Sequence, residues 1–236
     1  MSEIYFIRHG QASFGEKNYD RLSPIGIRQA ELLAQHMLHT KQSFDAIYCG
    51  TMTRQKRSAR ELTECFSTSE FPVPDALVTP DFDEYDSFSV WDSQIPLMLK
   101  EDPALSVTLA KAHTDRKSFQ RIFEEVMLRW VSGNYDHNGV STWADFKKRV
   151  INGVSKIMET RGSGRKIIVF TSGGPVSAVV QLALGLSDNK TIELSWQVLN
   201  SSVTRFKYSS KGIMLYGFND IAHIEKENDR SLITYR

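Results

Sequence analysis

Apolar residues fall along this chain in two alternating patterns, and together these patterns predict its regular structure. Short continuous apolar runs at 4–7, 46–49 and 166–170 predict buried strands, the last of them being the clearest. Over 24–38 and 52–66, apolar residues instead recur every three or four positions, which is the spacing of helices buried on one face. Strands that alternate with helices are typical of an α/β fold with a largely parallel sheet.

Residues that cap helices and form turns refine this outline. Ser23 followed by Pro24 predicts an N-cap and a first helical position. Thr142 with Asp145 resembles a capping box that opens a helix ending near 157. Four further elements are expected: a short strand around 76–78, a helix over 176–186, and a hairpin of two strands over 202–208 and 213–217.

The stretch from about 85 to 145 differs from the rest of the chain because it is aromatic, acidic and rich in residues that favour helices. Its apolar residues recur at helical spacing over 119–130. We predict a mostly helical insertion that covers the sheet's edge and the active site. Neither a linker nor a repeat nor a low-complexity segment interrupts the sequence, so we expect residues 1–236 to form a single domain.

Composition and charge narrow the class of protein. With 236 residues, of which 41% are apolar, the chain can bury a substantial core. A net charge of +1 provides no field that would attract nucleic acid or an acidic membrane, and no apolar run is long enough to span a bilayer. Two cysteines cannot build a disulfide framework, which favours a reducing compartment. We expect a cytoplasmic protein without nucleic-acid or membrane partners; the sequence leaves its oligomeric state open.

Residues that could bind or attack a phosphate group lie at or just after the ends of three predicted strands. Arg8-His9-Gly10 follows the first, the segment 49–54 with Arg54 follows the second, and Ser172-Gly173 follows the clearest. Ligands gather at the carboxyl ends of strands in open α/β sheets. If these ends converge, two guanidinium groups, an imidazole and backbone N–H donors meet in a site suited to a phosphate group. Histidine can attack phosphorus as a nucleophile, and arginine can hold the phosphate.

Each of these residues also has an ordinary structural explanation. Arg54 lies in a basic run typical of a solvated helix face, although a cation at a helix N-terminus opposes the helix dipole. Gly173-Gly174-Pro175 is also compatible with a plain turn between a strand and a helix. Composition alone does not select Glu84 over Asp81 or Asp83 as a functional acid.

Two other kinds of catalysis fit the sequence poorly. A nucleophile elbow at Ser172 requires glycine two positions earlier, where this chain has Phe170. The six histidines show no metal-ligand spacing, so we expect no metal and no other cofactor. His223, after the last predicted strand, is interpreted as structural, with an approach to the pocket as the alternative.

Several segments in order resemble the histidine phosphatase superfamily, also called the phosphoglycerate mutase-like family. They are residues 6–11 (FIRHGQ), residues 20–26 (DRLSPIG) followed by Gln29-Ala30, and Arg54. Glu84 stands where the family places its proton donor, and 169–175 stands in place of its last pocket strand. The match spans most of the chain, but the insertion carries no recognisable motif. The resemblance implies a three-layer α/β/α sandwich and metal-free phosphoryl transfer through a phosphohistidine.

The same resemblance assigns roles to individual residues. His9 would be the nucleophile, and Glu84 would protonate the leaving alcohol and later activate water. The residues expected to bind the phosphoryl group are Arg8, Arg54, Ser172 and Gly173. Gln11 and Asn18 are expected as secondary substrate contacts. Nearby guanidinium groups would keep His9 neutral, and Glu84 would need a pKa raised by aromatic residues of the insertion, such as Tyr85, Phe88 or Trp91.

Ser172 departs from the family pattern, which places a second histidine at this position. A serine hydroxyl donates one hydrogen bond but adds no positive charge. Losing the charged donor that a histidine provides costs about 2.7–4 kcal/mol of transition-state stabilisation. The sequence therefore predicts a phosphomonoester hydrolase with a reduced rate. The alternatives are a phosphomutase and a phosphate-binding or regulatory protein with little turnover. In each case the expected ligand is a small phosphorylated molecule or inorganic phosphate.

Overall fold

The computed structural model describes residues 1–13, 16, 19–67, 69–112, 114–160 and 163–235. A mixed sheet lies at its centre, formed by β1 (Ser2–Arg8), β2 (Ala46–Cys49), β3 (Ala76–Val78), β4 (Lys166–Thr171), β5 (Val203–Ser209) and β6 (Gly212–Asp220). Their order across the sheet is β3-β2-β4-β1-β5-β6. The first four in this order run parallel, whereas β5 and β6 are antiparallel to their neighbours. The predicted largely parallel sheet is confirmed.

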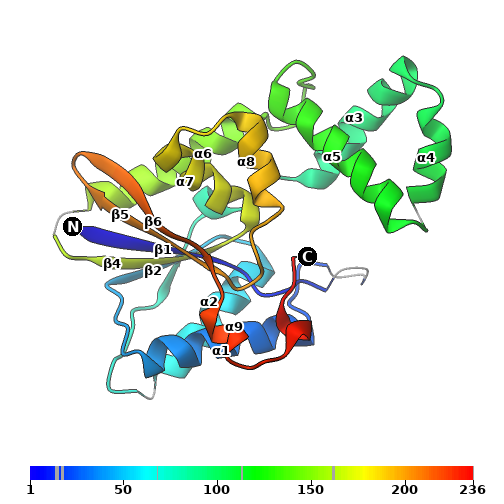
Figure 1. Ribbon diagram of the computed structural model, residues 1–236. Coiled ribbons are helices and arrows are strands. Elements are labelled where there is room, and N and C mark those ends of the chain that lie inside the picture. Colours follow the sequence, from blue (N-terminus) through cyan, green and yellow to red (C-terminus); the bar gives the residue numbers. More distant parts are fainter. Residues whose placement is uncertain (14–15, 17–18, 68, 113, 161–162, 236) are drawn as a thin grey trace.

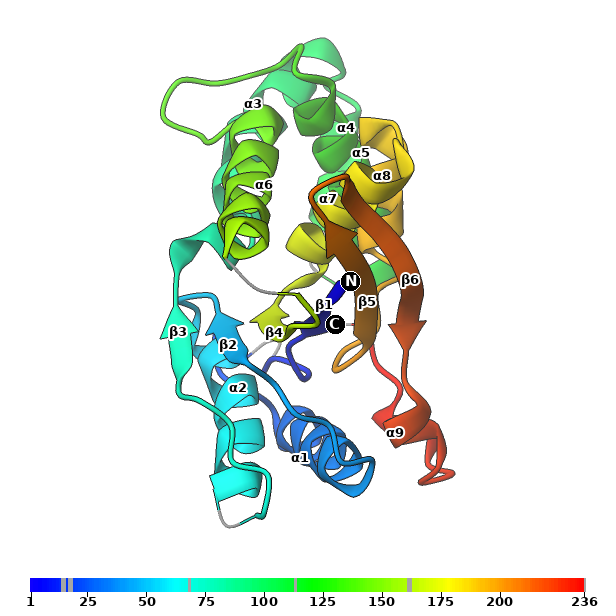
Figure 2. The ribbon, with the colours of Figure 1, turned by 90° about the vertical axis from the view of Figure 1, so that its left-hand side faces the viewer.

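Helices cover both faces of the sheet (Figures 1 and 2). One face carries α1 (Pro24–His39) and α2 (Thr53–Ser67), and the other carries α6 (Trp143–Glu159), α7 (Gly173–Leu184) and α8 (Asp188–Ser195). This arrangement confirms the predicted three-layer α/β/α sandwich. A short helix, α9 (Ala222–Glu225), packs against α1, and single 3₁₀ turns lie at Pro80–Phe82 and Arg230–Leu232.

Two hydrophobic cores follow from the alternation of side chains along the central strands. In β1, Ile4 and Phe6 face the core beneath α6 and α7, whereas Tyr5 and Ile7 face the core above α1 and α2. Because both faces are covered, the strand reads as a continuous apolar run rather than as an alternating one. This burial explains why the sequence identifies the central strands so clearly.

Two of the predicted helix starts have the expected hydrogen bonds. The Ser23 hydroxyl oxygen accepts from the Gly26 N–H at 3.0 Å, and Pro24 occupies the first helical position. The Thr142 hydroxyl oxygen accepts from the Asp145 N–H at 3.0 Å and donates its own proton to the Asp145 carboxylate at 2.7 Å. Both helices therefore begin where their sequences predict.

The start of α7 differs from the prediction. The helix begins at Gly173, so that Gly173, Gly174 and Pro175 form its first turn instead of a turn before it. Proline is tolerated there because the N–H groups of the first turn have no partner within the helix. The short helices α8 and α9 were not predicted, because eight and four residues are too few for a clear periodicity.

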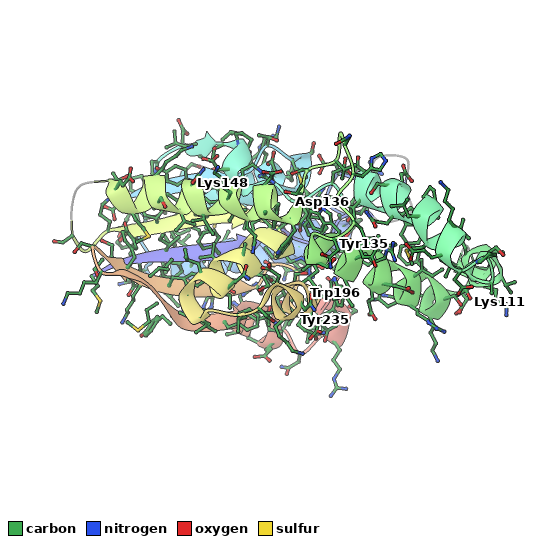
Figure 3. The ribbon with its side chains drawn as sticks, turned by 90° about the horizontal axis from the view of Figure 1, so that it is seen from above. Lys111, Tyr135, Asp136, Lys148, Trp196 and Tyr235 are labelled. Carbon is green, nitrogen blue, oxygen red and sulfur yellow. The ribbon has the colours of Figure 1, made fainter. Side chains whose placement is uncertain are left out.

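The region from 85 to 145 is largely helical, as predicted, and contains α3 (Ser87–Glu101), α4 (Leu105–Ala112) and α5 (Arg116–Ser132). Its helices extend from the side of the sheet at which β1, β2 and β4 end (Figure 1). Figure 3 shows Lys111 of α4 at the outer end of this excursion, and α5 packs against α8. Within the described ranges, no helix is long and apolar enough to cross a membrane.

Candidate active site

The carboxyl ends of β1 and β4 place the predicted residues side by side. Arg8 is paired with Thr171 in the parallel register, and the His9 N–H donates to the Thr171 carbonyl at 2.8 Å. Continued by one residue, this register places His9 next to Ser172. Because β4 lies between β1 and β2, the beginning of α2 with Arg54 reaches the same edge of the sheet.

His9 is a buried imidazole whose tautomer is defined by both of its neighbours. Its Nδ1 lies 2.7 Å from the Gly10 carbonyl oxygen, which can only accept, and its Nε2 lies 3.0 Å from Arg54 Nε, which can only donate. The proton therefore resides on Nδ1, and Nε2 carries the lone pair. Burial, followed by the charges of Arg54 and Arg8, lowers the pKa of His9 well below its usual value. His9 is thus neutral near pH 7.

Gly10 fixes this loop against the beginning of α1. A Cβ atom at Gly10 would overlap the backbone of Gly26, and a Cβ atom at Gly26 would overlap the backbone of Gln11. The two chain segments approach so closely that only glycine fits at either position. The carbonyl group that orients His9 is therefore held by a backbone contact with a helix.

Arg54 is buried and held by an acidic partner. Its Nη1 donates to the Asp20 carboxylate at 2.7 Å, and the other carboxylate oxygen of Asp20 accepts from the Thr53 N–H at 2.7 Å. The Tyr19 ring centre lies 5.5 Å from the Arg54 guanidinium carbon. Asp20 therefore both caps α2 and orients Arg54 so that its Nε faces His9. The sequence analysis did not identify this role, since Asp20 entered it only as part of a motif.

Arg8 has no acidic hydrogen-bond partner among the residues that the structure describes. One terminal nitrogen donates to the Val198 carbonyl, and the buried Nε has no hydrogen-bond partner. Burial lowers the pKa of Arg8, which reflects the cost of keeping a guanidinium group away from water. A buried cationic donor without a partner is a candidate ligand for an anion.

Glu84 is also buried at this site. Its carboxylate accepts from the Gly174 N–H at 3.1 Å and from the Tyr85 N–H at 3.2 Å. Burial nevertheless raises its pKa, against the opposing effects of these hydrogen bonds and of Arg54. A Cβ atom at Gly174 would overlap the carboxylate, so glycine is what allows Glu84 to reach the N-terminus of α7.

Of the three aromatic residues proposed to shield Glu84, Tyr85 has the clearest structural support. Its ring packs against Trp130 and Phe146, with centroid distances of 5.0 and 5.5 Å. Phe88 is instead 69% exposed and contacts the Tyr19 ring edge-on. Trp91 stacks on another aromatic residue of the insertion.

Ser172 is buried, and its hydroxyl oxygen accepts from Gln55 Nε2 at 2.9 Å. Although it occupies the N-cap position of α7, its side chain makes no capping hydrogen bond. A Cβ atom at the adjacent Gly173 would lie 3.9 Å from the Arg8 guanidinium carbon, which places this backbone beside the arginine. Sequence analysis missed Gln55, because only its position next to Arg54 marks it.

Two other residues singled out from the sequence, Gln11 and His223, have surroundings of their own. The Gln11 side-chain oxygen accepts from the Ser23 hydroxyl at 2.8 Å, which ties Gln11 to the beginning of α1, and Asn18 lies outside the described residues. His223 is buried, with Nε2 3.2 Å from Ser201 Oγ and its ring 6.3 Å from that of His36. Its described contacts lie on the α1 side, which supports a structural role.

No group of three or more possible metal ligands occurs among the residues described.

Comparison with known proteins identifies the family of the chain. The model of the histidine phosphatase superfamily (branch 1) matches residues 4–87 and 110–221. None of the curated proteins matches the chain significantly.

Solved structures provide the comparison of folds. A phosphoglycerate mutase from Bacillus anthracis str. Sterne superposes with a TM-score of 0.66 at 15% identity, over 97% of each chain. Phosphoserine phosphatase from Entamoeba histolytica, in complex with 3-phosphoglyceric acid, gives 0.62 at 17% identity, over 95% of this chain and all of that one. A putative alpha-ribazole-5'-P phosphatase from Escherichia coli K-12 gives 0.59 at 18% identity, over 94% and 97%. By fold and by family match, the chain belongs to the histidine phosphatase superfamily.

Proposed function

We propose that this protein hydrolyses small phosphomonoesters without a metal ion, through a phosphohistidine on His9. The observation that carries the proposal is the neutral His9 imidazole, with its Nε2 lone pair directed at Arg54 and with the neighbouring Arg8, whose Nε has no partner among the described residues. A nucleophile and an anion-binding site are thereby combined in one buried place. The Glu84 carboxyl group, with its raised pKa, supplies an acid.

In the first step, His9 Nε2 attacks phosphorus, and the bond to the leaving oxygen breaks with its electron pair on that oxygen. Glu84 donates its proton to this oxygen, so the alcohol leaves neutral. Arg54 exchanges its contact with His9 for a phosphoryl oxygen, and Arg8 binds another through its free Nε. Positioning and charge compensation of this kind supply most of the catalysis in phosphoryl transfer.

In the second step, water attacks the phosphohistidine. The Glu84 carboxylate removes a proton from the water, the P–N bond breaks, and its electron pair returns to Nε2. His9 is neutral again and Glu84 is protonated, so the cycle closes without a net change in the protein. A second hydroxyl group in place of water would make the protein a phosphomutase.

The ligand class is supported by the charge of the site and by the solved structures. Arg54 is paired with Asp20, whereas Arg8 has no acidic hydrogen-bond partner in the described part of the chain, so a protonated Glu84 leaves an excess positive charge for a phosphate group. The phosphatase structure with 3-phosphoglyceric acid supports a small phosphorylated molecule as ligand. The neutral donor Ser172 supports a slower reaction than a charged donor would allow, or, in the limiting case, a phosphate-binding protein with little turnover.

Phosphate release tests the proposal. Wild-type protein is assayed on p-nitrophenyl phosphate, phosphoserine and 3-phosphoglycerate, with phosphorus NMR to detect transfer to a second hydroxyl. We expect turnover of at least one substrate, its loss in His9→Ala, and full activity in His39→Ala, which removes an exposed histidine of α1. Retained binding of inorganic phosphate with no turnover of any substrate would establish the phosphate-binding alternative instead.

A further inference from the structure

The first turn of α2 makes contact with two strand ends through consecutive residues. Arg54 donates to His9 after β1, and the next residue, Gln55, donates to Ser172 after β4. His9 and Ser172 are themselves neighbours, because Arg8 and Thr171 pair in the parallel register. A single helical turn therefore organises the nucleophile and the residue beside it.

The orientation of the Gln55 amide is determined by its other contacts. Its Nε2 also donates to the Phe82 carbonyl at 3.1 Å, and its Oε1 accepts from the Met52 N–H at 3.3 Å. Since a carbonyl can only accept and an N–H can only donate, the NH₂ group must face Ser172. The Ser172 oxygen is therefore an acceptor in this contact, and its own proton remains available.

The Ser172 proton has no acceptor in the described part of the chain. Serine at an N-cap normally accepts from the first turn of its helix, but here the Gly174 N–H is bonded to Glu84 instead. Ser172 is 1% exposed, so water does not reach it freely. A buried hydroxyl proton without an acceptor, located next to His9, needs a ligand oxygen to satisfy it.

We infer that Gln55 is a positioning residue, which holds the Ser172 hydroxyl so that it donates to the phosphoryl group at His9. The inference rests on the proposed function and adds a residue that neither the motifs nor the family match assigns. Gln55 and Ser172 together form the third donor of the site, beside the two arginines. The pair is neutral at every pH at which the protein is folded.

The two positions are also coupled through space. Gln55 Nε2 lies 2.9 Å from the Ser172 oxygen, and Gln55 is fully buried. An imidazole extended in the direction of the Ser172 oxygen would therefore overlap the Gln55 amide. A histidine at 172 becomes useful as a charged donor only when residue 55 is small.

A double-mutant cycle tests the hydrogen-bond pair. Ser172→Ala and Gln55→Leu are each expected to lower kcat about 10- to 100-fold with little change in KM, because the donor acts on the transferring group. The double variant is expected to be no slower than the slower single variant, since both remove the same interaction. Thermal unfolding of each variant confirms folding. Gln94→Leu, which removes another buried glutamine bonded to a backbone carbonyl, is expected to lower stability but to leave kcat unchanged.

A second pair of variants tests the spatial coupling. Ser172→His alone is expected to be no faster than wild type, whereas Gln55→Ala combined with Ser172→His is expected to exceed Gln55→Ala at least 10-fold below the imidazole pKa. This gain should disappear as the imidazole loses its proton, which adds a limb to the pH profile. Multiplicative effects in the double-mutant cycle, or a faster Ser172→His single variant, would overturn the inference.

The inference remains testable if the wild-type protein has no turnover. In that case the proposed function fails, and the affinity for inorganic phosphate replaces kcat as the readout. Ser172→Ala, Gln55→Leu and the double variant should then weaken phosphate binding to the same extent. Unchanged affinity in these variants would reject a donor role for the pair independently of catalysis.

Discussion

Burial acts on two residues of the site in opposite directions and thereby prepares both for reaction. A low-dielectric environment penalises the charged form of any group. His9 therefore loses its proton more readily, and Glu84 keeps its proton more readily, than either would in water. The two shifts therefore move the pH range in which His9 is neutral and the pH range in which Glu84 is protonated toward each other.

The opposite pKa shifts of His9 and Glu84 predict the pH dependence of the reaction. We expect kcat/KM for an alkyl phosphate to fall as pH rises through the raised pKa of Glu84, because only the protonated acid can assist the leaving group. Protonation of His9 should lower the rate only at pH values well below 6.5. Rates measured from pH 4 to 9 would test for the alkaline limb and for the absence of an acid limb near pH 6.5.

Glu84→Gln provides the control. The variant should lose the alkaline limb for an alkyl phosphate. With p-nitrophenyl phosphate, whose leaving group needs no proton, it should release one equivalent of p-nitrophenol and accumulate phosphohistidine. An alkaline limb that persists in the variant would assign that limb to another group.

At the scale of elements, the N-terminus of α7 and the first turn of α2 organise the site. Sequence patterns located both helices but could not reveal the contacts between them. Gln55 and Ser172 are 117 positions apart, and Asp20 and Arg54 are 34 apart, so no local period links either pair. The residues that touch the phosphate in our proposal stand in recognisable motifs, whereas the residues that orient them are set by tertiary packing.

The insertion brings an aromatic residue close to Arg54 by way of Tyr19. Phe88 of α3 is exposed and meets Tyr19 at a centroid distance of 6.5 Å, and Tyr19 lies over Arg54. We expect Phe88→Ala to raise KM for 1-naphthyl phosphate about 3- to 10-fold, the value of one aromatic contact, with kcat unchanged. The KM for phosphoserine should change less.

Val107→Ala is the matched variant, since it truncates an exposed apolar residue of α4. Its kinetic constants should equal those of the wild-type protein. Equal increases in KM for both substrates in Phe88→Ala would show that Phe88 supports the site without contacting the leaving group.

At the scale of the whole molecule, apolar patterning accounts for the sheet, its two cores and most of its helices. It did not reveal α8 and α9, which are held by packing rather than by their own periodicity. The single-domain assignment and the roles of the site residues remain predictions. Stability, by contrast, depends on buried titratable groups, among them two histidines.

His223 links stability to pH. Burial lowers its pKa to about 3, so the unfolded chain binds a proton below pH 6.5 that the folded protein does not bind until about pH 3. Stability should therefore decrease as pH falls through this window, by up to about 1.4 kcal/mol per pH unit for this residue. Buried His9 contributes in the same direction.

Urea unfolding at pH 6.5, 5.5 and 4.5 measures this effect. In His223→Gln, the side chain can still bond to Ser201. The slope of the unfolding free energy against pH should fall by the amount that corresponds to about one bound proton. His39→Gln, which removes an exposed histidine of α1, is the matched variant. An unaltered slope in His223→Gln would mean that His223 is protonated in the folded protein.

The order of strands has a consequence for synthesis of the chain. β4 lies between β1 and β2 in the sheet, although it follows both in sequence. After β2 leaves the ribosome, about 120 further residues must be made before β4 can join them, which takes about 6 to 25 s at ordinary rates of translation. During that interval the edges of β1 and β2 that later pair with β4 expose unpaired backbone N–H and C=O groups, so we expect early α1–α2 packing or a chaperone to protect the nascent chain until its central strand arrives.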